Sequence, residues 1–127
     1  MPITRCTTSD EAAAHLEAIV ASQGSALFVF FGAEDPQTGE SWCPDCITAD
    51  PVLRRIIAAT RKDLVLYECP VGERADWKNQ PAHPYRLHPL LRVARIPTLV
   101  FFENGVERGR LVEADCAQVA TVEAFLG

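Results

Sequence analysis

Residues 26–46 read ALFVFFGAEDPQTGESWCPDC, an apolar run that leads through a polar loop to two cysteines with two residues between them. The run at 26–31 is too short for an ordinary helix and is rich in aromatic residues, which predicts a strand buried on both faces in the middle of a sheet. Apolar residues at helical spacing from about 44 to 62 predict that a helix begins at the cysteine pair. Pro44 suits the first turn of that helix, because a proline lacks the N–H that a helix leaves unpaired there.

The rest of the chain alternates between predicted helices and strands. We expect a short strand at 3–7, a helix from Thr8 to Gly24, a strand at 63–69, one or two short helices within 70–95, hairpin strands at 98–103 and 106–112 around Asn104-Gly105, and a final helix capped by Asp115 and Gln118. These assignments rest on a capping-box pattern at Thr8 and Glu11, on apolar periodicity and on the Asn-Gly turn signal. In the helix at 44–62, Pro51 should introduce a kink. The residues of that helix expected to be buried are Ile47, Val52, Leu53, Ile56 and Ile57.

The order of these elements defines the fold class. Strands linked by helices pair in parallel, and the hairpin adds an antiparallel edge. The predicted class is therefore α/β, with a central mixed sheet of four to five strands flanked by helices on both faces. A length of 127 residues is close to the commonest domain size, so we expect residues 1–127 to form a single domain.

Composition and charge exclude several classes of protein. The net charge is −5 and the lysines and arginines are scattered, so neither a nucleic-acid surface nor a polybasic membrane patch is expected. No apolar stretch approaches the roughly 18 residues of a membrane-spanning helix, and the first residues lack a secretory signal pattern. Of five cysteines only one pair is closely spaced, which fits a reducing compartment better than a secreted disulfide scaffold. We expect a cytoplasmic monomer.

The cysteine pair is the candidate for catalysis. The first turn of a helix presents unpaired N–H groups and a positive dipole end, which lower the pKa of a cysteine there from about 8.5 towards roughly 7 or below. Cys43 is therefore the expected exposed nucleophile, and Cys46, one turn further in, is the expected buried resolving thiol. Attack of the Cys43 thiolate on a substrate disulfide gives a mixed disulfide, which Cys46 then resolves.

Zinc sites use the same Cys-x-x-Cys spacing, but a tetrahedral site requires two more ligands. The available candidates are Cys69, Cys116, His83 and His88. They do not form a second close pair, and a strand–helix junction is the wrong setting for a zinc knuckle, so a metal site is disfavoured. The lone cysteines Cys6, Cys69 and Cys116 are interpreted as small buried hydrophobic residues. We interpret His83 and His88 as surface residues without a role.

The segment Trp42-Cys43-Pro44-Asp45-Cys46 is similar to the signature of one thioredoxin subfamily, that of thioredoxin domain-containing protein 17, also called thioredoxin-related protein of 14 kDa. Ordinary thioredoxins have Gly-Pro between the cysteines. Four further features resemble this family in register: Pro51 in the helix, Ile96-Pro97-Thr98 as a cis-proline segment, the Asn104-Gly105 hairpin, and Cys69–Arg74 with Trp77-Lys78. The resemblance covers nearly the whole chain and implies a thioredoxin fold.

The resemblance also implies a function and the residues that carry it. It implies a cytosolic reductase of protein disulfides and of small disulfides such as cystine, recycled by an NADPH-dependent thioredoxin reductase and binding no cofactor itself. It further implies a peroxide-reducing side activity. The alternative is a redox-switched binding module in signalling, without turnover. Catalysis is assigned to Cys43 and Cys46, with support from Trp42, Pro44, Asp45, Ile96, Pro97 and Glu113.

Departures from ordinary thioredoxins predict a narrower substrate range. Phe30 falls where those proteins keep a buried aspartate that assists proton transfer at the resolving cysteine, so that role passes to another group or to water. Asp45 is one candidate, although its charge also suits the first turn of a helix. Glu113 replaces a usual glycine near the dithiol. We hypothesise that acidic residues form a rim that, with the longer loop at 32–41, disfavours acidic protein partners: Asp45, Glu113, Glu34, Asp35 and Glu40.

Overall fold

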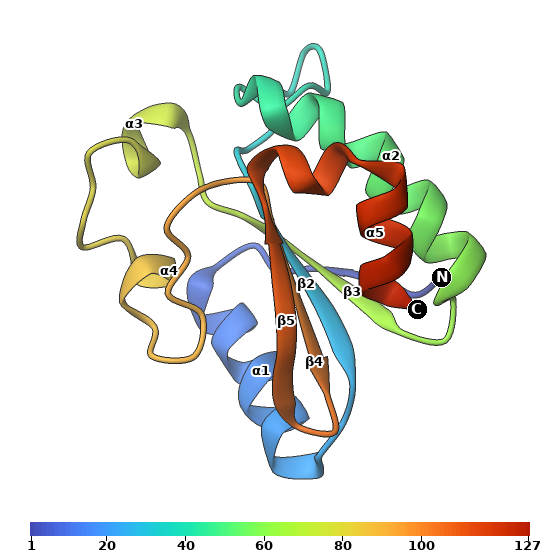
Figure 1. The fold of residues 1–127 in the computed structure, drawn as a ribbon. Helices are drawn as coiled ribbons and strands as arrows, with labels where there is room; N and C mark the ends of the chain where they lie inside the picture. The colour runs from blue at the N-terminus through green and yellow to red at the C-terminus, as the bar shows by residue number, and fades with distance from the viewer.

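A five-stranded sheet with helices on both faces forms the centre of the molecule (Figure 1). The computed structural model describes all residues from 1 to 127. Its elements are β1 Ile3–Arg5, α1 Ser9–Ser22, β2 Ala26–Phe31, α2 Pro44–Thr60, β3 Val65–Pro70, α3 Arg74–Trp77, α4 Pro84–Leu87, β4 Thr98–Glu103, β5 Val106–Val112, the 3-10 helix η1 Glu113–Ala117 and α5 Val119–Leu126. None of the helices combines the length and the apolar character needed to cross a membrane.

The sheet is mixed, as the order of elements predicts. The strand order is β1-β3-β2-β4-β5, with β3 parallel to both β1 and β2, and with β4 antiparallel to both β2 and β5. The α/β class is therefore confirmed, and β2 lies in the middle of the sheet. The hairpin turn is confirmed as well, because Asn104 and Gly105 both have positive φ angles of 55° and 82°, the conformation that a two-residue hairpin turn requires.

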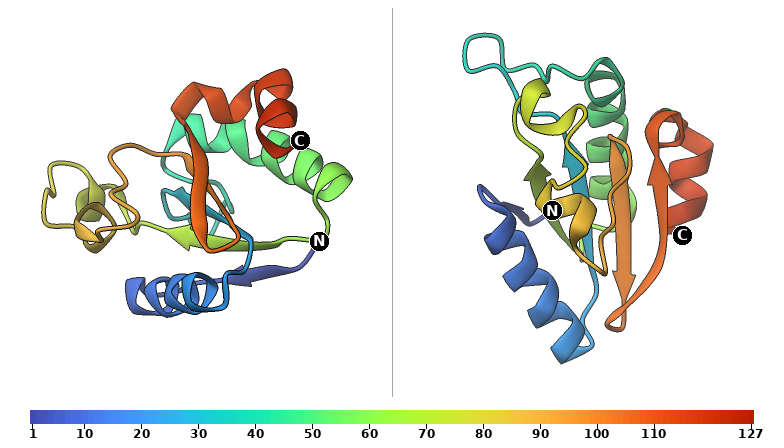
Figure 2. Two further views of the ribbon diagram at one scale, coloured as in Figure 1. Left: turned by 60° about the horizontal axis from the view of Figure 1, so that its bottom comes forward. Right: turned by 90° about the vertical axis from the view of Figure 1, so that its left-hand side faces the viewer.

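The central strand β2 separates two hydrophobic cores. Leu27 and Val29 contribute to the core under α2 and α5, whereas Phe28 and Phe30 contribute to the core under α1 and the segment of α3 and α4. The left view of Figure 2 shows the sheet between α1 on one side and α2 with α5 on the other. A strand that is apolar at nearly every position fits this place because both of its faces are covered.

The helix α2 begins at Pro44 and contains Pro51. Its buried residues are Cys46, Ala49, Leu53, Ile56 and Ile57. The expectation that Ile47 is buried is wrong, since its side chain is 40% exposed. Position 47 follows the buried Cys46 by one residue, which is about 100° around the helix, and it therefore turns away from the sheet.

The ends of α1 differ in detail from the predicted pattern. The Thr8 hydroxyl accepts the backbone N–H of Glu11 over 3.1 Å, as an N-cap does. The Glu11 carboxylate, however, accepts the N–H and the hydroxyl of Thr7 and not the N–H of Thr8. At the other end Gln23, and not Gly24, takes the left-handed conformation with a φ of 54°.

The start of α5 also departs from the prediction. The expected cap formed by Asp115 and Gln118 is wrong, because residues 113–117 form the 3-10 helix η1 and no side chain caps α5. Within η1 the Cys116 side chain is fully buried. The residues predicted to cap α5 therefore belong instead to a tight turn, and this turn buries Cys116 against the sheet.

Candidate active site

Ser41 fixes the end of the loop between β2 and α2 and so places Cys43 at the start of the helix. Its hydroxyl donates to the carbonyl oxygen of Gly32 over 2.6 Å and accepts the backbone N–H of Cys43 over 3.1 Å. Cys43 is the N-cap of α2, and its Sγ accepts the backbone N–H of Cys46 over 3.3 Å. This N–H is one of the groups that the first turn of a helix leaves without a partner.

Cys43 and Cys46 are free thiols, and both are nearly buried. The expectation of an exposed Cys43 is wrong in degree, because only 6% of this residue is accessible, against 4% of Cys46. Ile96 covers part of it, and the Cys43 thiol lies 4.0 Å from the Ile96 carbonyl oxygen. The two cysteines differ mainly in what they face, since Cys43 lines a wide groove and Cys46 lines a separate, smaller cavity.

Contact between the two cysteines separates their acidities. The hydrogen bond with Cys46 lowers the pKa of Cys43 from an ordinary 9.0 to about 7, although burial opposes the change. The same contact, together with burial, raises the pKa of Cys46 well above its ordinary range. At neutral pH about half of Cys43 is then thiolate, against a few per cent for an unperturbed cysteine of pKa about 8.5. Cys43 is therefore the more readily ionised thiol, whereas Cys46 retains its proton.

The peptide bond between Ile96 and Pro97 is cis, as the resemblance predicts. Neither the N–H nor the C=O of Ile96 takes part in a backbone hydrogen bond, although the segment lies directly beside Cys43. On its other side the segment is fixed, because the N–H of Glu113 donates to the Pro97 carbonyl over 2.7 Å. The backbone groups of Ile96 are thus free to pair with an extended segment laid across the dithiol.

Trp42 forms part of the groove wall next to Cys43. Its indole N–H donates to the Gly72 carbonyl over 2.8 Å. The ring lies so close to Gly32 that a Cβ at that position would be 2.5 Å from the ring atom Cε2. A glycine at position 32 is therefore required by the close approach of the indole. The contact with Gly32 and the hydrogen bond to Gly72 together fix the orientation of the Trp42 ring.

A groove with a volume of about 450 Å³ opens on the Cys43 side of the dithiol. The first turn of α2, the segment around α3 and the residues before Pro97 form its walls. Its charged lining residues are Arg74, Lys78, Arg86, Arg95, Asp45 and Glu113. The four cations were not expected at the dithiol, because they are spread along the sequence between positions 74 and 95.

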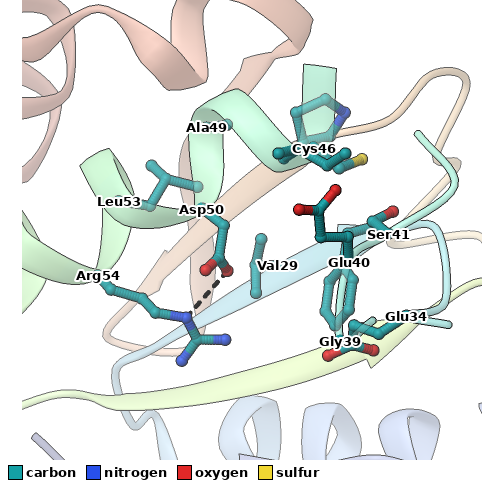
Figure 3. A pocket seen from close by; sticks show the side chains of 13 residues that line it. Val29, Glu34, Gly39, Glu40, Ser41, Cys46, Ala49, Asp50, Leu53 and Arg54 are labelled. Carbon is teal, nitrogen blue, oxygen red and sulfur yellow. Dashed lines mark hydrogen bonds and ion pairs between the residues drawn. The ribbon is translucent and has the colours of Figure 1, made fainter. Parts of the chain in front are cut away.

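A smaller cavity of about 200 Å³ lies on the Cys46 side, between α2 and the loop that follows β2 (Figure 3). Its charged lining residues are Glu34, Glu40, Asp50 and Arg54. The five acidic residues proposed from the sequence therefore do not form one rim. Asp45 and Glu113 lie among cations in the groove, whereas Glu34 and Glu40 lie in the other cavity, and Asp35 lines neither of them.

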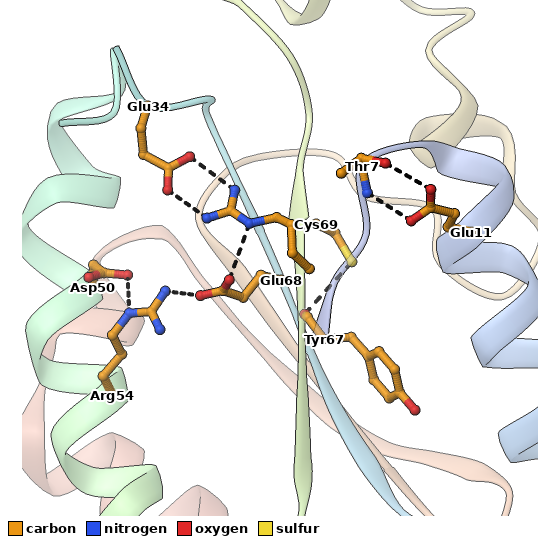
Figure 4. Close-up of polar contacts among 9 residues, drawn as sticks. Thr7, Glu11, Glu34, Asp50, Arg54, Tyr67, Glu68 and Cys69 are labelled. Carbon is orange, nitrogen blue, oxygen red and sulfur yellow. Dashed lines mark hydrogen bonds and ion pairs between the residues drawn. The ribbon is translucent and has the colours of Figure 1, made fainter. Parts of the chain in front are cut away.

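Buried Glu68 organises the outer wall of the smaller cavity (Figure 4). Its side chain is only 8% exposed, and it pairs with Arg5 over 3.2 Å and with Arg54. Arg5 also pairs with Glu34 over 2.7 Å, and Arg54 pairs with Asp50 over 2.9 Å. Because a buried carboxylate is costly without partners, this network ties β1, β3, α2 and the loop after β2 together around one charge.

The remaining cysteines and histidines have structural roles. Three cysteines are fully buried, as expected: Cys6, Cys69 and Cys116. No group of three or more His, Cys, Asp or Glu side chains is arranged to hold a metal ion. The interpretation of His83 as a residue without a role is wrong, since its Nδ1 accepts the N–H of Tyr85 over 3.1 Å and its Nε2 lies 2.7 Å from the Val71 carbonyl. This ring therefore links α4 to the chain after β3.

The chain is similar to known proteins over nearly its whole length. Over residues 6–127 it matches the thioredoxin domain of the thioredoxin domain-containing protein 17-like family. The chain belongs to this family. The thioredoxin-like protein Clot of Oryza sativa subsp. japonica is 36% identical over 104 residues, which are 79% of this chain and 74% of that protein. Thioredoxin domain-containing protein 17 of Homo sapiens is 35% identical over 106 residues, which are 84% of this chain and 81% of that protein.

The structural comparison agrees on the fold. The crystal structure of thioredoxin O2 from Arabidopsis thaliana in its oxidized state superposes with a TM-score of 0.69, covering 98% of this chain and 93% of that chain at 21% sequence identity. At this level of identity the likeness shows the fold alone. As a thioredoxin domain-containing protein 17-like chain, the protein is a redox protein of the thioredoxin type.

Proposed function

We propose that this protein is a reductase of protein disulfides and small disulfides, and that Cys43 attacks the substrate while Cys46 resolves the intermediate. The observation that carries the proposal is the pair of unlike thiols at the start of α2. Contact with Cys46 brings the pKa of Cys43 to about 7, and the Cys43 Sγ lies at a groove next to the unpaired backbone of Ile96. A thiolate in such a place is available at neutral pH to a disulfide held across it.

The reaction proceeds in two exchanges whose atoms balance. The Cys43 thiolate attacks one sulfur of the substrate disulfide, so that a Cys43–substrate bond forms and the second substrate sulfur leaves as a thiolate. Cys46 then loses its proton and attacks the Cys43 sulfur. The first substrate sulfur leaves as a thiolate, and the protein retains the Cys43–Cys46 disulfide. Two electrons have passed from the dithiol to the substrate.

Turnover requires a donor that returns these two electrons. The sequence has no nucleotide-binding loop, so we assign this step to a separate NADPH-dependent thioredoxin reductase, with no cofactor bound to the chain itself. Five free cysteines support a cytoplasmic location, and we propose that the protein acts as a monomer made of one domain. Around the dithiol, Trp42, Pro44 and Asp45 shape the groove of Cys43, and Ile96 and Glu113 form its opposite side, whereas Pro97 lines the cavity of Cys46.

The substrate range is proposed to be narrower than that of ordinary thioredoxin. Charged side chains line the groove beside Cys43, and small disulfides such as cystine fit its volume of about 450 Å³. The Cys43 thiolate would also react with peroxides, which gives a peroxidase side activity. In that reaction the Cys43 thiolate attacks the peroxide, which leaves a sulfenic acid on Cys43 and releases an alcohol or water, and the Cys46 thiol then displaces water from the sulfenic acid to form the Cys43–Cys46 disulfide.

A coupled assay tests the proposal. The protein is mixed with thioredoxin reductase, NADPH and cystine or an insulin disulfide, and the oxidation of NADPH is followed. We expect turnover by the native chain and none by Cys43→Ser. A Cys46→Ser variant should accumulate mixed disulfides on Cys43, which mass spectrometry of trapped partners identifies. A chain that binds partners in a redox-dependent way but shows no turnover with any disulfide would instead be the binding module.

A further inference from the structure

The groove beside Cys43 carries a charge opposite to that of the whole chain. The protein has a net charge of −5, yet four cations and two acids line this groove. The Debye length at physiological ionic strength is about 8 Å, so a substrate held at Cys43 experiences mainly these nearby groups. The local field therefore favours negative charge on whatever lies next to the reacting sulfur.

Two of the cations are free to meet such a substrate. Arg74 and Lys78 are exposed side chains at the two ends of α3, and neither forms an ion pair or a side-chain hydrogen bond. They stand one helical turn apart and so point from the same side of that segment. Arg95, by contrast, is neutralised in part by Glu113 at 3.1 Å.

Arg86 supplies a fixed positive charge in the wall behind them. Its guanidinium lies 3.5 Å from the centre of the Trp77 ring and donates to the Ala94 and Trp77 carbonyls over 2.7 and 3.0 Å. Its Nε is buried and has no hydrogen-bond partner. Carbonyl groups and an aromatic ring hold this cation in place without cancelling its charge, so it adds to the field of Arg74 and Lys78.

We propose that this groove selects peptide disulfides whose half-cystine is flanked by acidic residues, with Arg74 and Lys78 as the residues that bind the carboxylates. The inference rests on the proposed function and adds the substrate class. It reverses the expectation from the sequence that acidic partners are disfavoured. The backbone of Ile96 would pair with the backbone of the substrate peptide, and Arg74 and Lys78 would bind its acidic side chains.

Two matched peptides test the charge selection. They carry the same disulfide, flanked in one case by two aspartates and in the other by two lysines, and the reduced protein is oxidised by each in a single turnover that needs no reductase. We expect the acidic peptide to react about tenfold faster at low salt, because each pair of unit charges about 8 Å apart in water changes the rate about twofold, and the two peptides differ in several such pairs with the groove. The difference should shrink to about twofold at 0.5 M salt.

Variants locate the effect in the groove. Replacing Arg74 and Lys78 by glutamine should remove most of the preference, whereas the control double variant Arg55→Gln/Lys62→Gln, which neutralises one exposed arginine and one exposed lysine elsewhere, should keep it. Equal rates for the two peptides with the native chain would overturn the inference while leaving the proposed function intact. Failure of the native chain to reduce either peptide would contradict the proposed function itself.

The cavity on the other side of the dithiol carries a second, independent inference. Cys46 must lose a proton before it can attack, yet β2 offers only apolar side chains beneath it, with Val29 lining the same cavity. Asp45 does not line that cavity, because it belongs to the groove of Cys43. Any base for Cys46 must therefore come from the loop after β2 or from α2.

Of the three carboxylates in this cavity only one is unengaged. Glu34 accepts two hydrogen bonds from Arg5, and Asp50 accepts one from Arg54 over 2.9 Å. The Glu40 carboxylate has no such partner, and Figure 3 shows it directed toward Cys46. The backbone of Glu40 is held in turn, since its carbonyl accepts the N–H of Asp35 over 2.8 Å.

The geometry points to Glu40 as the group that accepts the proton of Cys46 during the resolving step. The proton passes to the Glu40 carboxylate as the Cys46 sulfur attacks Cys43, the bond between Cys43 and the substrate sulfur breaks, and the substrate leaves as a thiolate. Glu40 then releases the proton to water. The charged groups that face this transfer are Glu34, Glu40, Asp50 and Arg54. This inference also rests on the proposed roles of the two cysteines.

A chromogenic disulfide separates the two exchanges. With 5,5′-dithiobis(2-nitrobenzoate) the first thiolate released reports attack by Cys43, and the second reports resolution by Cys46. We expect Glu40→Gln to slow the second phase at least tenfold at pH 7 while leaving the first unchanged, and the loss should shrink at high pH as hydroxide takes the proton. The control Glu34→Gln, from the same cavity, should resolve at the native rate.

An unchanged second phase in Glu40→Gln would overturn the role of Glu40. A second phase that is absent in the native chain would instead contradict the roles of the two cysteines in the proposed function. If both glutamate variants slow the second phase equally, the cavity acts only through its overall charge, and Glu40 has no special role.

Discussion

The two sides of the dithiol differ in charge, in volume and in how their charges are held. On the Cys43 side an open groove of about 450 Å³ carries cations on a short helix and a loop, and two of them have no partner. On the Cys46 side the charged residues that line a cavity of about 200 Å³ are three carboxylates and one arginine, and all but one of the carboxylates are tied into ion pairs. Cys43 therefore faces the groove that we propose to bind the substrate, and Cys46 faces the cavity to which we assign the proton transfer.

This difference teaches how one hydrogen-bonded pair of thiols can have two roles. Contact between Cys43 and Cys46 moves their pKa values in opposite directions, so that one is a thiolate when the other is protonated. Each thiol then needs different surroundings: an attacking thiolate needs a substrate held in place, whereas a resolving thiol needs a base. In the proposed function both are supplied at the start of α2, because it lies between the groove and the cavity.

The largest expected effect is a difference in reactivity between the two cysteines. When the reduced protein is treated with iodoacetamide and digested for mass spectrometry, Cys43 should be alkylated at least about 100-fold faster than Cys46 at pH 7, from thiolate fraction and access combined. Since the pKa of Cys43 is lowered to about 7, its alkylation rate should increase with pH, with a midpoint near pH 7. A midpoint near 9, or faster alkylation of Cys46, would contradict the assignment.

The next largest effect concerns how much the ion-pair network on the Cys46 side contributes to the stability of the fold. Glu68→Ala removes the carboxylate that Arg5 and Arg54 share and should lower the free energy of unfolding by about 2–3 kcal/mol. This value is less than the 3–5 kcal/mol for a fully buried pair, because both arginines are partly exposed and can rehydrate. Urea denaturation measures the change.

The matched control for Glu68 is an exposed ion pair on the same chain. Asp63→Ala breaks a pair with Arg61 whose carboxylate is 63% exposed, and such pairs contribute about 0–1 kcal/mol. Equal losses in the two variants would mean that the Glu68 network adds no more than a surface pair. The Cys43 side should be unaffected in both, so the midpoint of Cys43 alkylation should not move.

On the Cys43 side the close contact between Gly32 and Trp42 provides the matching test. Gly32→Ala would place a Cβ 2.5 Å from the indole, and overpacking of this kind costs about 1–3 kcal/mol. The ring should shift, which changes its fluorescence. In a Trp42→Phe background the same substitution should cost clearly less, because the smaller ring leaves space. An additive double-mutant cycle would show that the two residues do not interact.

Local signals in the sequence were sufficient for much of the fold. The apolar run at 26–31, the cysteine pair before a helix and the Asn104-Gly105 turn each depend on residues that are neighbours in sequence, and the structure confirms all three. The predictions were wrong where contacts between distant parts of the chain determine the local structure. The η1 turn replaced the expected cap at Asp115 because Cys116 is buried, and a burial of that kind is not visible in a capping pattern.

The charge around the dithiol was the least predictable feature. Arg74, Lys78, Arg86 and Arg95 are spread over 22 residues of the sequence, and only the folding of α3 and α4 beside Cys43 brings them together. The acidic residues near the dithiol were identified from the sequence, but their division between two hollows depends on which side of α2 the loop after β2 lies. The spacing of Arg74 and Lys78 at one helical turn was the one available signal for a shared face.

The smallest expected effect comes from Glu113. This residue is an acid in the cationic groove, and its backbone φ angle is 54°. Glu113→Gly relieves about 1 kcal/mol of left-handed strain but adds a similar entropy to the unfolded chain, so stability should change by less than about 0.5 kcal/mol. Glu113→Gln keeps the strained backbone. Both variants release Arg95 from its ion pair and should speed reduction of an acidic peptide about twofold at low salt. Equal acceleration in the two variants assigns the effect to charge. Acceleration by Glu113→Gly alone would assign it to the backbone. That result would weaken the contrast between a binding side and a proton-transfer side of the dithiol.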